Sequence, residues 1–202
     1  MSARRAAWGS WRRHLQLALK LGLLWSSSAA WAAGNGLLGP DFLEGFVDDL
    51  GHVIHPRELS RPLRLVAFGY TSCPDVCPLT LAALHQALIR LGPDAARIDP
   101  VFVSVDPDRD ILSRLHSYVS AFDPRIRAYR GDESRLRALA DGLQVSYWRE
   151  ASGTDRNSYA VDHTSTLFLL SRDGRVLARI YHYADPVVLS QAIAEAVKKS
   201  GG

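Results

Sequence analysis

Apolar positions along the chain form both continuous runs and helically spaced patterns. LRLVAFGY (63–70) and PVFVSVD (100–106) are near-continuous apolar runs of strand length, typical of strands buried on both faces. Between them, PLTLAALHQALIRL (78–91) has apolar residues at helical spacing and ends before a Gly-Pro pair. A strand, a helix and a second strand in this order predict parallel pairing of the two strands.

The rest of the chain continues this alternation. Helical spacing predicts three further helices, over 110–122 (beginning near Asp110), 132–143 and 185–199. A hairpin is predicted over 166–181, and two short strands around a turn at Leu50-Gly51 are predicted over 41–54. This element order predicts an α/β, thioredoxin-like fold, with a central mixed sheet flanked by helices and an N-terminal β-hairpin extension.

The first 32 residues have the order of a secretory signal peptide. The segment has a basic start, an apolar run over 15–25 and the cleavage-like tripeptide Ala30-Trp31-Ala32, and it contains no acidic residue. We therefore expect a signal peptide over 1–32 and one domain over 33–202, exported to a bacterial periplasm.

Two other interpretations of the leader stay open. An uncleaved anchor in the inner membrane needs roughly 20 apolar residues, and Lys20 interrupts the run. A mitochondrial presequence, and with it the mitochondrial inner membrane, is the second alternative, because such presequences are also basic and free of acidic residues.

The leader also accounts for the basic character of the chain. It carries five Lys and Arg and no Asp or Glu, so the remaining residues carry 19 basic and 21 acidic side chains. The predicted domain is therefore close to −2, and the basic sequence pI does not indicate a nucleic-acid partner.

The chain has only two cysteines, Cys73 and Cys77, in FGYTSCPDVCPLT (68–80). They lie at the first strand-to-helix junction, and reactive groups gather at the carboxyl ends of strands in such sheets. A structural disulfide, a redox-active pair and a metal site are the three possible roles. A bridge closing a loop of about five residues gives only ~2 kcal/mol, so the spacing argues against a purely structural disulfide.

The flanking residues favour reactive thiols. Pro74 and Pro78 suit the start of a helix, where unpaired N–H groups and the helix dipole favour a thiolate. Asp75 lies between the cysteines and opposes this effect through its like charge. The sequence leaves open which of the two effects is larger.

A histidine follows far along the chain, in YAVDHTSTLFLL (159–170). His163 occupies the place, just before the predicted hairpin, where thioredoxin-like oxidoreductases usually have a cis-proline beside their cysteines. An imidazole there would face both thiols. Two sulfurs and one imidazole suit copper, although zinc also accepts Cys2His ligation.

Three motifs together resemble the Sco/SenC family: FGYTSCPDVCP (68–78), SVDPDRD (104–110) and VDHTS (161–165). The resemblance covers about residues 40–200. It implies a thioredoxin-like copper-binding factor for assembly of the CuA centre of cytochrome c oxidase. By position it implies three copper ligands, Cys73, Cys77 and His163, and two acidic residues near the site, Asp162 and Asp106.

The leading hypothesis is therefore a copper metallochaperone rather than an enzyme, binding Cu(I) or Cu(II) and acting on the copper-bearing subunit of cytochrome c oxidase. Other copper chaperones or thiol reductants of the periplasm are further expected partners, with a possible N-terminal membrane tether. The alternative is a thiol–disulfide oxidoreductase that uses Cys73 and Cys77 to reduce the cysteines of the oxidase copper site. A peroxidase and a domain with an inert disulfide are weaker alternatives.

Overall fold

The structure is a computed structural model, and it describes residues 38–55, 57, 59–151, 159–181 and 185–199. The predicted signal peptide lies outside the described residues, so the division of the chain at residue 32 stays a prediction. No helix in these described ranges is both long and apolar enough to span a membrane.

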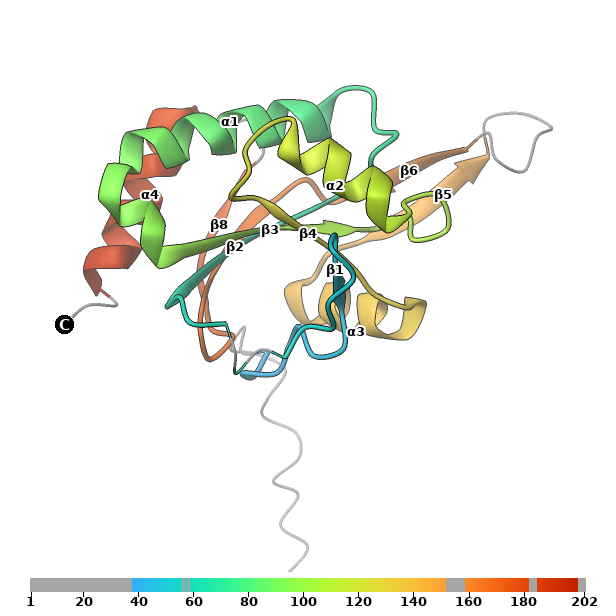
Figure 1. Cartoon of the computed structure of the whole chain (residues 1–202), viewed down its shortest axis with the longest axis horizontal. Coiled ribbons are helices and arrows are strands. Elements are labelled where there is room, and N and C mark those ends of the chain that lie inside the picture. The colour runs from blue at the N-terminus through green and yellow to red at the C-terminus, as the bar shows by residue number, and fades with distance from the viewer. Residues whose placement is uncertain (1–37, 56, 58, 152–158, 182–184, 200–202) are drawn as a thin grey trace, which may run out of the picture. The chain divides into compact units, whose positions relative to one another are not determined.

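Six strands form one mixed sheet (Figure 1). They are β1 (Val47–Asp48), β2 (Leu63–Gly69), β3 (Ile98–Ser104), β4 (Arg127–Arg130), β7 (Leu167–Ser171) and β8 (Val176–Ile180). Their order across the sheet is β1-β4-β3-β2-β7-β8. β2, β3 and β4 run parallel, whereas β1, β7 and β8 pair antiparallel with their neighbours.

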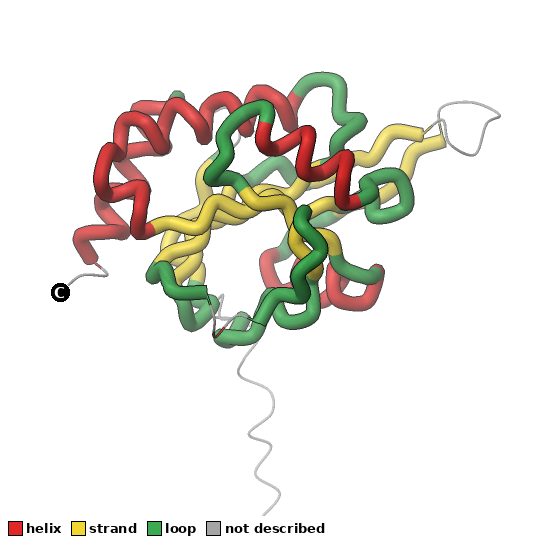
Figure 2. The backbone as a smooth tube through the Cα atoms, viewed as in Figure 1, coloured by secondary structure: helices red, strands yellow, loops and turns green. Residues whose placement is uncertain are grey.

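Helices cover both faces of this sheet (Figures 1 and 2). α1 (Val76–Leu91), α2 (Leu112–Ser120) and α4 (Pro186–Lys199) share one buried cluster, and α3 (Glu133–Leu143) belongs to a second cluster on the opposite face. A 3-10 helix, Gly92–Arg97, connects α1 to β3.

Strand β2 shows why a buried central strand is apolar at almost every position. Leu63, Leu65 and Ala67 pack in the cluster under α1, α2 and α4, whereas Val66 and Phe68 pack in the cluster with α3. Side chains alternate between the faces of a strand, so both faces of β2 need apolar residues. The strands predicted over 63–70 and 100–106 are accordingly the two central parallel strands.

The N-terminal hairpin is short. Val47 forms an antiparallel bridge with Val53, and the same segment pairs with β4 at the edge of the sheet. The turn forms because the Asp48 carboxylate accepts hydrogen bonds from the backbone N–H groups of Leu50 and His52, both at 2.9 Å. Gly51 completes it with φ of +92°.

The structure differs from the predicted elements in two places. The helix expected near Asp110 begins at Leu112, because the Asp110 carboxylate is fully buried and bonds to Thr71 and Ser104 instead of capping a helix. The second difference is an unpredicted two-stranded ribbon, β5 (Tyr147–Ala151) with β6 (Tyr159–His163), which forms a sheet of its own.

Candidate metal centre

The two cysteines and His163 come together from separate elements. Cys73 lies in the loop between β2 and α1, Cys77 lies in the first turn of α1, and His163 is the last residue of β6. One sulfur from each cysteine and one ring nitrogen all lie within 4.8 Å of one another. The Cys77 Sγ is 3.5 Å from the His163 Nε2. Within the described part of the chain this is the one such group of three His, Cys, Asp or Glu residues.

The orientation of the His163 ring suits a metal ligand. Its Nδ1 lies 3.1 Å from the carbonyl oxygen of Thr164. A carbonyl only accepts hydrogen bonds, so in the neutral ring Nδ1 carries the proton and Nε2 keeps a lone pair. That lone pair lies on the side of the sulfurs. Fixing the outer nitrogen in this way is the usual arrangement for ligating histidines.

The absence of a side chain at Gly69 leaves space for the Cys77 sulfur. A Cβ at Gly69, the last residue of β2, would lie 2.8 Å from the Cys77 Sγ and 2.6 Å from a ring carbon of Phe102. Both neighbours are almost fully buried. The close approach of Cys77 to the end of β2 therefore requires a residue without a side chain at position 69.

The two thiols have opposite acid–base properties. The pKa of Cys73 falls to about 3, chiefly because the Cys77 thiol hydrogen-bonds to it, with additional hydrogen bonds from the backbone N–H groups of Asp75 and Cys77. The pKa of Cys77 is raised, because Cys73 and burial both favour its protonated form. The pair therefore holds a thiolate at the half-buried Cys73 and a thiol at the buried Cys77.

The opposing effects left open by the sequence are now resolved. Backbone N–H groups at the start of α1 stabilise the Cys73 thiolate, and the Asp75 carboxyl is exposed. Water screens an exposed charge, so the helix terminus has the larger influence on Cys73.

The two acidic residues expected near the site occupy different environments. Asp106 is fully buried and accepts hydrogen bonds from the Arg109 side chain and, at 2.6 Å, from the Tyr159 hydroxyl. Asp162 is exposed and lies opposite Trp148 across the ribbon. Because side chains alternate along a strand, Asp162 points to the face opposite His163. A role for either residue in the site stays a prediction.

The loop that holds the cysteines is anchored by a residue pair that the sequence did not reveal. The Asp110 carboxylate accepts from the Thr71 hydroxyl at 2.6 Å and from the Ser104 hydroxyl at 2.7 Å. The backbone N–H of Thr71 also donates to it, at 3.2 Å. A fully buried carboxylate needs such partners, so Asp110 ties the cysteine loop to the end of β3. No local pattern signals a contact across 39 residues.

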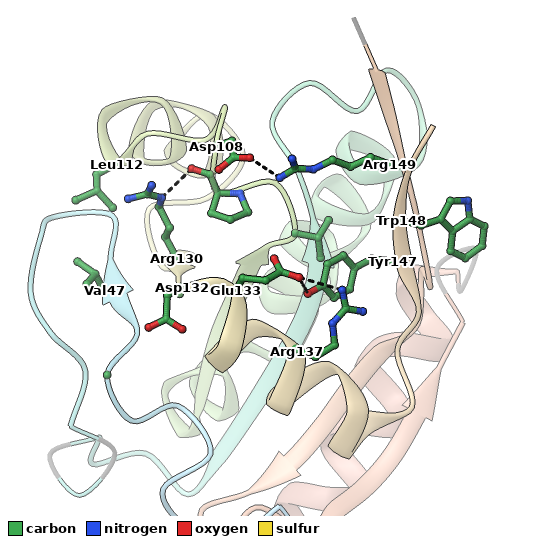
Figure 3. Close-up of a pocket in the computed structure, with 14 residues that line it drawn as sticks. Val47, Asp108, Leu112, Arg130, Asp132, Glu133, Arg137, Tyr147, Trp148 and Arg149 are labelled. Atoms are coloured by element: carbon green, nitrogen blue, oxygen red, sulfur yellow. Dashed lines mark hydrogen bonds and ion pairs between the residues drawn. The ribbon is translucent and has the colours of Figure 1, made fainter. Parts of the chain in front are cut away.

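A cavity of about 970 Å³ lies beside β5, and Tyr147, Trp148 and Arg149 contribute to its lining (Figure 3). None of the three candidate ligands is among its lining residues. Two of its arginines form ion pairs: Arg149 pairs with Asp108 at 2.6 Å, and Arg137 pairs with Glu133 at 2.9 Å. The candidate site is therefore the group of two thiols and one imidazole, outside this cavity.

Fold and site together define a thioredoxin-like protein whose first strand-to-helix junction carries two thiols facing an imidazole. The chain belongs to the SCO1/SenC family, which it matches over residues 33–198. The fold class predicted from the sequence is thus confirmed.

Named relatives agree with this assignment. The chain is 33% identical to an SCO2-like protein of Rickettsia prowazekii over 135 residues, which are 67% of this chain and 66% of the relative. It is 35% identical to the mitochondrial SCO2 homolog of Bos taurus over 145 residues, 71% of this chain and 52% of the relative.

Solved structures of copper-bound proteins are also similar. Bradyrhizobium japonicum ScoI with copper bound is 31% identical, with a TM-score of 0.66, and the match covers 77% of this chain and 95% of that one. Arabidopsis thaliana ScoI with copper bound is 25% identical, with a TM-score of 0.69 and coverage of 77% and 96%.

The space at Gly69 can be tested by substitution. Gly69→Ala is expected to destabilise the domain by about 1–3 kcal/mol through overpacking and to displace the Cys77 sulfur, which would change the reactivity of the thiol pair. Gly131→Ala is a matched control, because its Cβ would meet the Phe46 ring at 2.7 Å in the other cluster. Urea unfolding measures the stability of each variant, and thiol labelling measures the reactivity of Cys73 and Cys77. A Gly69→Ala protein with unchanged thiol reactivity would contradict the close-approach argument.

The unequal thiols predict selective alkylation. At pH 5 the folded, reduced protein should react with iodoacetamide at Cys73 but not at Cys77, because only Cys73 is a thiolate there and only Cys73 is partly exposed. Peptide mapping by mass spectrometry locates the label. In urea both thiols return to a pKa of about 8.5 and should react slowly and equally at this pH. Equal labelling of the folded protein would disprove the asymmetry.

Proposed function

We propose that the protein is a copper metallochaperone that binds one copper ion through Cys73, Cys77 and His163 and assists assembly of the CuA site of cytochrome c oxidase. The observation that carries the proposal is the convergence of two sulfurs and one ring nitrogen within 4.8 Å. Such a site gives the ion enough ligands to be held and leaves it accessible for transfer to a partner.

The donor set favours copper as the cargo. Thiolates are soft ligands that select Cu(I), and imidazole also suits copper. A structural zinc site is normally closed by four protein ligands, whereas the group found among the described residues supplies three. The two copper-bound ScoI relatives support the same choice.

Binding would depend on the redox state of the cysteines. A metal ligand must be a deprotonated sulfur, and oxidation of Cys73 and Cys77 to a disulfide removes two electrons and leaves neither sulfur available as a thiolate. Copper loading would therefore require a reductant. This links the proposal to thiol reductants of the periplasm as partners, alongside the copper-bearing subunit of the oxidase.

The composition of residues 1–32 supports a proposal for where the protein acts. Export to a bacterial periplasm is the leading proposal, since residues 1–32 have the composition of a signal peptide. The Bos taurus relative named above is a mitochondrial protein, which corresponds to the alternative location, the mitochondrial inner membrane.

Titration with Cu(I) tests the proposal. In the presence of a colorimetric Cu(I) chelator, the reduced protein should take up one equivalent of copper. Cys73→Ser and Cys77→Ser should each lose this stoichiometric binding, because each removes a thiolate ligand. His163→Ala keeps both sulfurs and should lose its copper at chelator concentrations at which the unmodified protein keeps it.

A histidine outside the site provides the control. His55 pairs with Glu44 on the surface, so His55→Ala should bind copper like the unmodified protein. Full binding by the Cys77→Ser protein, or no binding by the unmodified reduced protein, would refute the proposed ligand set.

A second function is favoured by the unequal thiols. The half-buried Cys73 thiolate could attack a disulfide of a partner protein, forming a mixed disulfide and releasing one partner sulfur as a thiolate. Cys77, after passing its proton to the released partner thiolate, would then attack the Cys73 sulfur, releasing the second partner sulfur as a thiolate and leaving a Cys73–Cys77 disulfide. An external thiol would have to reduce that disulfide before the next cycle.

The two functions differ in their need for His163. Binding of copper by three ligands requires the imidazole, whereas thiol–disulfide exchange requires only the cysteines. A His163→Ala protein that still restores oxidase assembly in cells lacking the chaperone would favour the reductase. Failure to restore assembly, with thiol exchange intact in a disulfide-reduction assay, would favour the chaperone.

A further inference from the structure

The strand that carries His163 lies outside the main sheet. Among the described strands, β5 and β6 pair only with each other. Backbone pairing with the sheet therefore does not fix the distance between His163 and the cysteine loop. Buried Tyr147 and Val161 attach the ribbon to the cluster around α3, but burial of apolar surface is non-directional. Directional contacts must come from polar side chains.

Arg109 supplies such contacts at the start of β6. Its Nη1 donates to the backbone carbonyl of Tyr159 at 2.9 Å, and its guanidinium lies 3.6 Å from the centroid of the Tyr159 ring. Its Nε donates to the Asp106 carboxylate, which also accepts from the Tyr159 hydroxyl at 2.6 Å. Arg109, Asp106 and Tyr159 therefore each contact the other two.

The same guanidinium reaches the cysteine side of the site. It lies 5.7 Å from the centroid of the Tyr70 ring, within the range of a cation–π contact. Tyr70 follows β2 directly, and its carbonyl accepts from the backbone N–H of Cys73 at 3.2 Å. The Tyr70 and His163 rings in turn meet edge to face, with centroids 6.0 Å apart. Arg109 thus contacts one tyrosine on each side of the site.

Burial makes these contacts costly to lose. Asp106 is fully buried, and the Arg109 side chain is only 17% exposed. A buried carboxylate that loses its nearest arginine is poorly compensated, because the remaining arginine, Arg149, lies 4.0 Å from Asp106. Asp110, the next residue along, ties Thr71 to Ser104. One short loop after β3 therefore contacts both the cysteine loop and the histidine strand.

We propose that Arg109 is a positioning residue that holds His163 at ligating distance from Cys73 and Cys77, and so determines whether copper is bound by three ligands or by the two sulfurs alone. The inference rests on the proposed function for its consequence in copper binding. The positional effect itself concerns the copper-free protein and can be measured without copper.

The experiment compares Arg109→Ala with the unmodified protein in two measurements. In the reduced, copper-free protein, NMR should show a cross-relaxation peak between the Tyr70 and His163 rings, and Arg109→Ala should lose or weaken it. In Cu(I) competition titrations, Arg109→Ala should weaken binding by about 10–100-fold, the usual cost of removing an outer partner of a metal ligand.

Arg127→Ala is the matched control. Arg127 also bridges buried carboxylates, with Asp48 at 2.7 Å and Asp49 at 2.8 Å, but it lies on β4, which pairs with the edge strand β1. Arg127→Ala should lower the free energy of unfolding, measured in urea, by an amount similar to Arg109→Ala. It should leave both the contact between the Tyr70 and His163 rings and the copper affinity unchanged. Equal losses of affinity in Arg127→Ala and Arg109→Ala would reduce Arg109 to a general stabilising role and overturn the proposal.

Two further variants keep the test decisive. Arg109→Lys keeps the charge but lacks the planar fork, and should restore part of the affinity lost in Arg109→Ala. If Arg109→Ala does not fold, Tyr159→Phe removes only the hydroxyl that donates to Asp106 and should shift both measurements in the same direction, by less.

The outcomes separate this inference from the proposed function. An Arg109→Ala protein with an unchanged ring contact and a copper affinity within twofold of the unmodified protein overturns the positioning role alone. If the unmodified protein binds no copper but the ring contact still depends on Arg109, the proposed function fails and the positioning role stands.

Discussion

The contact between the His163 ring and the cysteine sulfurs is the constraint on which the site depends, and it is made between segments that the main sheet does not join. Cys77 is fixed by the end of β2 and by α1, whereas His163 belongs to a ribbon with its own pairing. A Cys77 Sγ to His163 Nε2 distance of 3.5 Å therefore reports how well side chains of the loop after β3 hold these segments together.

The chemistry of the pair follows from where the fold places each sulfur. Cys73 receives hydrogen bonds at the start of α1 and is a thiolate, whereas Cys77 sits against Gly69 and stays protonated when no metal is bound. A thiolate next to a thiol suits disulfide exchange as well as metal capture. The imidazole separates the two functions, because a three-ligand metal site requires its free nitrogen whereas the sulfur exchange itself takes place between the two cysteines. Membership of the SCO1/SenC family agrees with a metal site.

Much of this arrangement could be predicted from the sequence, because it depends on local patterns. The apolar runs identify the central strands, and the position of Cys73 and Cys77 after the first of them places the thiols at the carboxyl edge of the sheet. The ribbon was missed because β5 (YWREA) is short and carries charged residues. Asp110 and Arg109 do not stand out in the sequence as site residues because their partners, Thr71 and Tyr159, lie 39 and 50 residues away. His163 is still further from Cys77, but its place just before the predicted hairpin indicates the contact, and no such sign links Asp110 to Thr71 or Arg109 to Tyr159.

X-ray absorption at the copper edge of the Cu(I)-loaded, reduced protein tests the central claim most directly, because it reports which atoms surround the metal. The account predicts two sulfur neighbours and one nitrogen neighbour, with the nitrogen absent after His163→Ala. A copper ion surrounded by sulfur alone in the unmodified protein, or an unchanged nitrogen signal after that substitution, would contradict it.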